Sequence, residues 1–582
     1  MIPQRALTGS TKHIFYAFAI VVLVAAAYSG TLHSPFTFDD ADYISENSFI
    51  KDTGQIWHPW SLEGATLSRN VIYSRYTRYV GYLSLHMNYM LGGLDPSGYH
   101  AFNIMVHAAC GVLVYFIALM LMQSPALASL VQPERRLPLA LASALLFSLH
   151  PVQTQAVTYI SQRFASLAAM FCLASVLSYL LYRMKGRTLY LALSVCASVL
   201  AMHTKENAFL MPLGIALLEF ALFESPQRQR IRALAPLLLT MLIVPLYKIA
   251  GASGAIGEAT STFNSMGRTE YLLTSIPVIA TYLRLILLPV NLNLDYDYPV
   301  YRSLADLHLA GALALHLALL GIALYLFRKN PAARLASVAI LWFYLMISVE
   351  NSIIPLADVI FEHRIYLPAV FILIALPIVA ASTTGRPYIV ASALVMLSLA
   401  LGAAAYARNA VWSDNITLWS DVVLKSPDKA RGHNNLGLAY KEAGDLDKAL
   451  MYFRRTLELE PDMTATRLNL GLIYDMSGKY EEALDEYAKV ADKWPTSYEV
   501  YNNMGLVYRK LGLYSKAVEA YGKSISLRPD FDAGYYNMGN AYMYLGMHSE
   551  AEASYLRAIA LNPNDERYAQ NLDVARRKLS GR

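Results

Sequence analysis

Apolar stretches long enough to cross a membrane recur along the chain up to about residue 407 and are absent from the sequence beyond it. The chain beyond about 410 is polar and has the spacing of amphipathic helices. This pattern predicts an all-α protein: a polytopic membrane domain at 1–410, a connector at 411–429 and a soluble helical domain at 430–582. The apolar stretches lie near 14–30, 102–122, 137–150, 164–182, 189–203, 207–223, 233–250, 271–290, 307–327, 335–349, 365–383 and 388–407.

Clusters of lysine and arginine between these stretches predict the orientation, because short cytoplasmic loops collect positive charge. If all twelve stretches were full spans, the cluster at 328–334 would be extracytoplasmic. The stretch at 271–290 contains Arg284 with Pro277 and Pro289, so we expect it to lie along the interface or to re-enter, which leaves about eleven spans. The clusters then expected in the cytoplasm are Arg5/Lys12, Arg135/Arg136, Arg183/Lys185/Arg187, Arg228/Arg230/Arg232, Arg328/Lys329/Arg334 and Arg386.

This orientation puts the N-terminus in the cytoplasm and the loop at 31–100 and the C-terminal domain outside it. The segments 150–163, 203–206, 251–306 and 350–364 share that outer side. The first apolar stretch resembles a cleaved signal peptide, but with so many later spans we expect a retained anchor. The localisation expected is an integral membrane protein, in bacteria that of the inner membrane.

The C-terminal part repeats itself every 34 residues, which is the period of tetratricopeptide repeats. The sequence predicts four repeats over about 430–563, followed by a capping helix. The columns that carry the period are Pro427, Pro461, Pro495, Pro529 and Pro563; Gly437, Gly471, Gly505 and Gly539; Ala449, Ala483, Ala517 and Ala551; and Tyr440, Tyr474, Tyr508 and Tyr542.

Asparagine occupies one further column, one turn into the first helix of each repeat. The first helices of such repeats line the concave surface, so the amides are expected to form a ladder that can donate to and accept from the backbone of an extended peptide. The alternative is that asparagine is merely common there and stabilises the turn. The residues are Asn435, Asn469, Asn503 and Asn537, and a similar ladder holds protein substrates in the O-GlcNAc transferases.

Composition narrows the class of protein further. Hydrophobic residues make up 55% of the chain and charged residues 16%, and the mean hydropathy of +0.34 is that of a polytopic membrane protein. The net charge of +5 is spread over short loops, so it indicates orientation rather than nucleic-acid binding. Cys110, Cys172 and Cys196 all lie in apolar stretches, which favours packing over a disulfide or metal role.

Polar motifs gather on the predicted outer side. The adjacent carboxylates Asp39 and Asp40 follow the first apolar stretch. Two carboxylates there repel each other and gain no stability from hydrophobic burial, so they are candidates for chemistry. The alternative interpretation is that the pair lies in an exposed turn. The remaining motifs are Phe147–Pro151 with Gln155, Gln162 and Arg163; His203–Asn207; Asn293–Tyr298; and Glu362–Pro368.

In combination, four of these features resemble the transmembrane and tetratricopeptide-repeat protein O-mannosyltransferases and their bacterial relatives. They are Phe-Asp-Asp at 38–40, Leu-Gly-Gly-Leu-Asp-Pro at 91–96, His-Pro at 150–151 and Arg-Ile-Tyr-Leu-Pro at 364–368. The resemblance covers essentially the whole chain. It implies a glycosyltransferase of the GT-C type that uses a polyprenyl- or dolichyl-phosphate sugar, and it leaves the sugar open.

Transfer of a sugar to a hydroxyl needs a carboxylate that orients or deprotonates the acceptor, a task for Asp40 or, second, Asp39. The leaving phosphate needs cations, for which Arg364, Lys205 and Arg163 are candidates, with Tyr366 beside Arg364. The alternative for the cations is snorkelling to the interface. The groups expected to act as acid, base or support are His150, Glu206, Glu362 and His363, although His150 can instead satisfy a carbonyl and Glu206 can instead neutralise Lys205.

No cofactor is certain, and a divalent metal on Asp295 and Asp297 is a weak candidate. The expected function is transfer of a sugar from a polyprenyl phosphate to Ser or Thr of exported proteins that the repeats hold. One alternative is a ligase or polymerase of lipid-linked oligosaccharides, disfavoured because the acidic pair lies in the first loop. Another is a membrane-anchored scaffold, for which one span would suffice.

Overall fold

The structure is a computed structural model that describes residues 4–58, 69–246, 266–352 and 355–581. Parts of the predicted outer segments 31–100, 251–306 and 350–364 therefore lie outside the described residues. The chain divides into two units, Met1–Leu418 and Trp419–Arg582. The division falls within the predicted connector, where the helix α20 (Asn415–Lys425) lies. The described residues form helices and no strands, which confirms the predicted all-α class.

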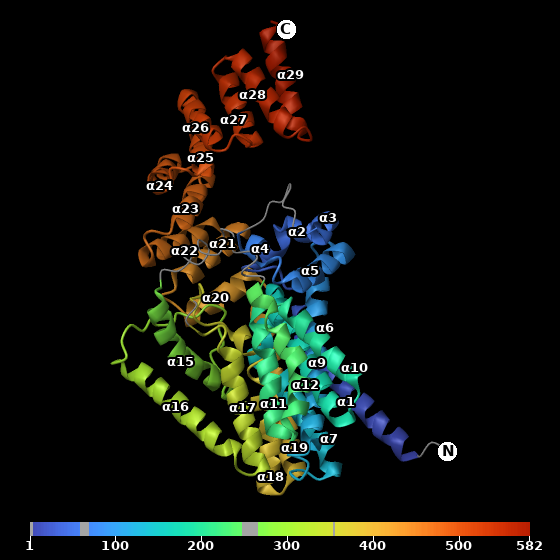
Figure 1. Cartoon of the computed structure of the whole chain (residues 1–582). Helices are drawn as coiled ribbons and strands as arrows, with labels where there is room; N and C mark the ends of the chain where they lie inside the picture. The colour runs from blue at the N-terminus through green and yellow to red at the C-terminus, as the bar shows by residue number, and fades with distance from the viewer. Residues whose placement is uncertain (1–3, 59–68, 247–265, 353–354, 582) are drawn as a thin grey trace. The chain divides into compact units, whose positions relative to one another are not determined.

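Within the described residues, each of the twelve apolar stretches overlaps a helix of the first unit (Figure 1). By length and composition, seven described helices can cross a membrane, or eight if the bent pair Pro133–Ser148 and Pro151–Thr158 is one span. Three shorter apolar helices add to these. The helices of this bundle are α1 (Gln4–Tyr28), α6 (Pro96–Gln123), α7 (Arg136–Ser148), α9 (Arg163–Lys185), α10 (Thr188–Met202), α11 (Met211–Leu222), α12 (Gln227–Thr240), α15 (Arg268–Leu287), α16 (Leu307–Phe327), α17 (Pro331–Ile347), α18 (Val370–Thr384) and α19 (Pro387–Asn409).

The expectation for the stretch at 271–290 is not supported. Its helix α15 is one of the seven that can cross a membrane. Arg284 lies in the last turn, where it bonds the Val290 carbonyl, and Pro277 lies inside the helix without ending it. Both features that suggested an interfacial segment are thus compatible with a full span. The span count of eleven stays a prediction.

Helix α6 lies at the centre of the bundle, against α1, α7 and α9. The first and last apolar helices also meet: the Asn409 side chain donates to the Ala27 carbonyl at 2.9 Å and accepts from Thr158 at 2.8 Å. Short helices between α1 and α6 form a second small core, packed on Phe164. They are α2 (Ser48–Lys51), α3 (Thr53–Trp57), α4 (Arg69–Ser74) and α5 (Tyr79–Gly92).

The two ends of the bundle carry different polar groups. At one end Arg183 pairs with the fully buried Glu219, and Arg230 lies 3.8 Å from the same carboxylate. This end holds basic clusters that the sequence predicts on one side of the membrane. The segments that follow α7, α10 and α17 carry predicted outer motifs, and they contact one another through Gln155 and His363 and through Lys205 and Glu350. The structure thus groups the motifs as predicted, while the choice of which end is cytoplasmic stays a prediction.

The second unit contains four helix pairs and a final helix, as the 34-residue period predicts (Figure 1). The repeat glycines are required by packing: a Cβ on Gly471 would lie 2.5 Å from the Tyr487 ring, and one on Gly505 would lie 2.6 Å from the Tyr521 ring. The helices are α21 (Ala430–Glu442), α22 (Leu446–Leu459), α23 (Thr464–Met476), α24 (Tyr480–Lys493), α25 (Tyr498–Lys510), α26 (Tyr514–Leu527), α27 (Asp532–Tyr544), α28 (His548–Leu561) and α29 (Glu566–Leu579).

Candidate functional site

A bend after α7 builds the centre of the candidate site. The chain turns by 48° at His150-Pro151 and continues through three short helical turns, η4 (Pro151–Gln153), α8 (Thr154–Thr158) and η5 (Ile160–Gln162). Proline lacks the N–H that would continue α7. His150 stabilises the bend: one ring nitrogen accepts from Val152 N at 3.3 Å and the other contacts the Ile286 carbonyl at 3.0 Å. Both nitrogens are therefore used by the backbone, which favours the support role of His150 over acid-base chemistry.

The acidic pair lies against one side of this bent segment. Asp40 is 1% exposed, and its two carboxylate oxygens accept from Ser161 N at 2.7 Å and from Thr37 N at 3.1 Å. Burial outweighs these hydrogen bonds and raises the pKa of Asp40 to about 7. Asp39 is only half-buried, and its backbone N–H donates to the Tyr159 hydroxyl at 2.9 Å. The two carboxylates are thus in different environments.

The residue before the pair is strained. Phe38 has a φ of +52°, a region that costs a bulky side chain energy and that accumulates at functional sites. Its ring lies 6.2 Å from that of Tyr159, centroid to centroid, so the same tyrosine contacts both Phe38 and Asp39. The loop that carries the carboxylates is therefore fixed to the bent segment at three successive residues, 38–40.

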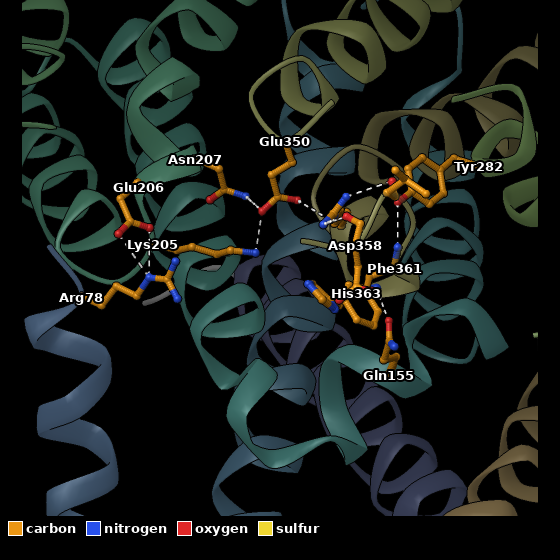
Figure 2. A network of polar contacts seen from close by, with 12 residues as sticks. Arg78, Gln155, Lys205, Glu206, Asn207, Tyr282, Glu350, Asp358, Phe361 and His363 are labelled. Carbon is orange, nitrogen blue, oxygen red and sulfur yellow. Dashed lines mark hydrogen bonds and ion pairs between the residues drawn. The ribbon is translucent and has the colours of Figure 1, made fainter. Parts of the chain in front are cut away.

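Two cations lie on the other side of the site and share one carboxylate (Figure 2). The Lys205 ammonium is 2.6 Å from Glu350 Oε1, and Arg364 Nε is 4.0 Å from Glu350 Oε2. The Asn207 amide also donates to Glu350, at 3.1 Å. Arg364 is held independently by the carbonyls of residues 358 and 359, at 2.7 and 3.0 Å. All three charged groups are less than one-tenth exposed.

The bent segment joins these two sides. On the cation side, His363 N donates to Gln155 Oε1 at 2.8 Å. The neighbouring Glu362 accepts from Asn293 N and from the Tyr296 hydroxyl, both at 2.6 Å, and so ties the 291–298 segment to the same place. Glu362 therefore supports the site rather than facing a ligand. The bent segment therefore bonds both Asp40 and the backbone beside Arg364, although these residues are far apart in the sequence.

Glu206 does not neutralise Lys205. Its carboxylate binds Arg78 Nε at 3.0 and 3.2 Å and accepts from Thr77 at 2.5 Å. Burial alone would raise the pKa of Glu206, but the Arg78 guanidinium and these hydrogen bonds lower it to about 2. The Arg78–Glu206 ion pair fixes the start of α5 to the segment after α10. Lys205 forms its ion pair with Glu350 instead.

Arg163 is not placed to bind a phosphate. It is fully buried and donates to Asn103 at 2.7 Å, to Asn88 at 2.6 Å, and to the carbonyls of Ser84 and Tyr99 at 3.1 and 2.9 Å. A guanidinium has five donors, and four of these hydrogen bonds go to neutral groups of α5 and α6. Arg163 therefore joins these helices to the start of α9, and this part of the sequence-based prediction is wrong.

Tyr366 is likewise a core residue. Its side chain is 1% exposed and its hydroxyl bonds His107 Nδ1 of α6 at 2.6 Å. It follows Arg364 in the sequence but points into the bundle, because the turn at 362–365 is a short 3₁₀ helix that separates the two side chains. The prediction that it binds the donor phosphate is not supported.

The carboxylates proposed for a metal do not converge. Asp295 is buried and Asp297 exposed, so the two carboxylates lie in different environments. Among the described residues, no group of three or more His, Cys, Asp or Glu is arranged to hold a metal ion.

The asparagine column of the repeats lies where the sequence places it. All four side chains are half-buried and each is on the first helix of its pair. Successive first helices contact one another, which puts them on the inner side of the solenoid. Asn469 already bonds Lys441 and the Ala465 carbonyl, whereas the Asn503 side chain makes no hydrogen bond to the described residues.

Comparison with known proteins agrees with both parts of the chain. Tetratricopeptide-repeat family models match residues 421–498, 505–546 and 533–565. The human protein O-mannosyl-transferase TMTC3 is 23% identical over 76% of this chain and 51% of its own length. The Caenorhabditis elegans protein O-mannosyl-transferase F38B6.6 is 22% identical over 78% of this chain and 64% of its own length. This chain is a distant relative of the transmembrane and tetratricopeptide-repeat family.

The human family member TMTC4 is 31% identical over 36% of this chain and 29% of its own length. The chain spans about half the length of the family member TMTC3. A crystal structure of MamA matches 26% of this chain and 90% of its own with 25% identity and a TM-score of 0.25, too low to carry an argument. The candidate membrane-spanning helices and the similarity to these relatives together support an integral membrane protein.

Reasoning from the sequence missed several residues. Glu350 and Arg78 belong to no motif, and each pairs with a distant residue: Glu350 with Lys205, 145 positions earlier, and Arg78 with Glu206, 128 positions later. Asn571 could have been found, because it follows Asn537 by the same 34-residue step and lies in α29. Its amide bonds Tyr536 and Asn540, so it extends the ladder into the capping helix.

Proposed function

We propose that this chain transfers a sugar from a polyprenyl-phosphate donor to Ser or Thr hydroxyls of exported proteins. The observation that carries the proposal is the shared bent segment 151–162: Ser161 N donates to Asp40, and Gln155 accepts from the backbone N–H of His363, the residue before Arg364. A donor phosphate at the cations and an acceptor hydroxyl at the carboxylates are the two requirements of such a transfer. The names of the relatives make mannose the first sugar to test.

In the proposed step, the bond between the sugar C1 and the phosphate oxygen breaks and a bond forms between C1 and the acceptor oxygen. The acceptor proton passes to a carboxylate, and the lipid phosphate leaves as a monoester. Lys205 and Arg364 stabilise the charge that develops on the leaving oxygen.

Asp39 is the better candidate for the base. The sequence favours Asp40, but both Asp40 oxygens accept from backbone N–H groups and the side chain is buried. A carboxylate engaged in this way fixes a loop and offers little to an acceptor. Asp39 is adjacent and more exposed, so we assign it the acceptor proton and assign Asp40 a positioning role.

The repeats are proposed to hold the acceptor as an extended chain. The asparagine ladder supports this role because amides recognise peptide backbone without regard to sequence. Because the repeats belong to the same chain as the membrane unit, capture would raise the local concentration of the acceptor.

Cells that lack the protein, complemented with the wild type or with a variant in which Asn435, Asn469, Asn503 and Asn537 are alanine, test the function. We expect exported proteins to lose Ser- or Thr-linked sugar in the deletion strain, to regain it with the wild type, and to regain it only partly with the ladder variant. Identical glycosylation with and without the protein would refute the proposed function.

A further inference from the structure

Glu350 occupies the position that the proposed donor phosphate needs. Its carboxylate contacts both Lys205 and Arg364, the two cations assigned to the phosphate (Figure 2). We propose that Glu350 is an internal counter-anion that leaves these cations when the donor phosphate binds and returns after transfer. This inference rests on the proposed function.

The contacts of Glu350 allow this exchange. Its backbone carbonyl is fixed by the Tyr271 hydroxyl at 2.7 Å, so only the side chain has to move. Its contact with Arg364 is 4.0 Å long and involves Nε alone, not the forked geometry of a strong pair. Arg364 keeps its two carbonyl acceptors when the carboxylate leaves, so the binding geometry persists.

The neighbouring carboxylate Glu206 shows the contrast. Both of its oxygens contact Arg78 Nε, and Thr77 adds a further hydrogen bond. If the Glu206 carboxylate moved away, Arg78 would lose its carboxylate partner. If the Glu350 carboxylate moved away, the donor phosphate would replace it beside Lys205 and Arg364. The two carboxylates therefore serve different purposes: Glu206 fixes structure and Glu350 is exchangeable.

Buried donors beside Glu350 point to an additional acceptor. His363 Nδ1 and the side-chain amide nitrogen of Asn351 are buried and have no hydrogen-bond partner among the described residues. Burial, together with the charges of Lys205 and Arg364, lowers the pKa of His363 well below its usual value, so the ring is neutral and an N–H can only act as an uncharged donor. Buried donors without acceptors are costly, and phosphate oxygens would satisfy them.

The charges balance across the proposed cycle. Lys205, Arg364 and Glu350 together carry +1, and a sugar-phosphate diester carries −1. After transfer the lipid phosphate is a monoester and carries about −1.5 to −2, as phosphate monoesters do at neutral pH. Two cations without a competing carboxylate would bind this monoester too tightly for its release. Return of the Glu350 carboxylate to Lys205 and Arg364 competes with the monoester and favours its release.

The test measures binding of a short-chain polyprenyl phosphate to the full-length protein in nanodiscs. We expect Glu350→Gln to tighten binding by about tenfold or more, because an anion close to the phosphate has been removed. Glu350→Asp, whose shorter side chain reaches the cations less well, should tighten it by a smaller factor. In transfer assays Glu350→Gln should lower both KM for the donor and kcat, since release slows.

Glu206→Gln is the matched control, because it removes one negative charge nearby without freeing Lys205 or Arg364, and we expect less than about threefold tightening. Unchanged or weaker binding by both Glu350 variants would overturn the exchange and leave Glu350 as a residue that positions the cations. Failure of the proposed function is separate: wild-type protein would then bind the lipid phosphate no better than Lys205→Gln.

Discussion

Replacement of Asp40 by asparagine should destabilise the membrane unit while leaving much of the transfer activity. Asparagine has one acceptor oxygen, so Ser161 N or Thr37 N would face an amide N–H in place of a carboxylate oxygen. A buried donor without an acceptor costs about 1–3 kcal/mol. Asp39→Asn removes none of these bonds and should leave stability unchanged.

The assay pairs denaturant unfolding of the purified variants with initial rates of sugar transfer. Loss of a general base costs about 10²–10⁴-fold in rate, so we expect that loss for Asp39→Asn and less than about tenfold for Asp40→Asn. The assignment would be refuted if Asp40→Asn kept wild-type stability and lost transfer while Asp39→Asn remained active. Asp40 would then be the base, as the sequence alone suggested.

Three further predictions follow from the same contacts. The pKa of Asp40 is about 7 when folded and 3.8 when unfolded, so the folded state binds this proton more tightly. Its contribution to stability is complete below about pH 4 and is lost as the pH rises through about 7, and unfolding of the wild type but not of Asp40→Asn should show this fall. Arg163→Met leaves four buried acceptors without a donor, each costing about 1–3 kcal/mol. This variant should therefore fail to yield a monodisperse peak in size-exclusion chromatography. Arg364→Met should fold but lose donor binding. Asn503→Ala should raise the KM for a protein acceptor severalfold and Asn469→Ala less, because the Asn469 amide is already bonded; equal effects would contradict the ladder assignment.

The repeat unit could be predicted almost residue by residue because its contacts are local and periodic. Each glycine of the 34-residue column faces an aromatic ring sixteen residues later, as Gly471 faces Tyr487. The same constraint recurs at every 34th residue, so the sequence displays it as a column. The apolar stretches were equally readable, since each needs only its own composition.

The partners of the charged residues could not be predicted from the sequence. Arg163 and Arg364 both follow polar residues next to apolar stretches, but Arg163 bonds neutral groups in the core and Arg364 contacts Glu350 in the site. The role of Arg163 depends on how α5 and α6 pack over the start of α9, a long-range contact without a local signal. The sequence predicts that Lys205 binds a phosphate but does not identify Glu350 as its ion-pair partner, because Glu350 lies 145 residues later and belongs to no motif.

The division of Asp39 and Asp40 also needed the structure. Adjacent carboxylates look alike in a sequence, and burial separates them only once the 151–162 segment packs beside them. His150 also needed the structure, because one of its bend-stabilising contacts comes from Val152 and the other from Ile286 of a distant helix.

The most direct test of the account is a reconstituted assay that separates donor binding from transfer. Purified protein in nanodiscs is given a polyprenyl-phosphate mannose and an exported acceptor protein, and both donor affinity and sugar on the acceptor are measured for the wild type and for Asp39→Asn. The account predicts equal donor affinity and transfer by the wild type only. Wild-type protein that transfers no sugar, or Asp39→Asn that transfers at the wild-type rate, would contradict it.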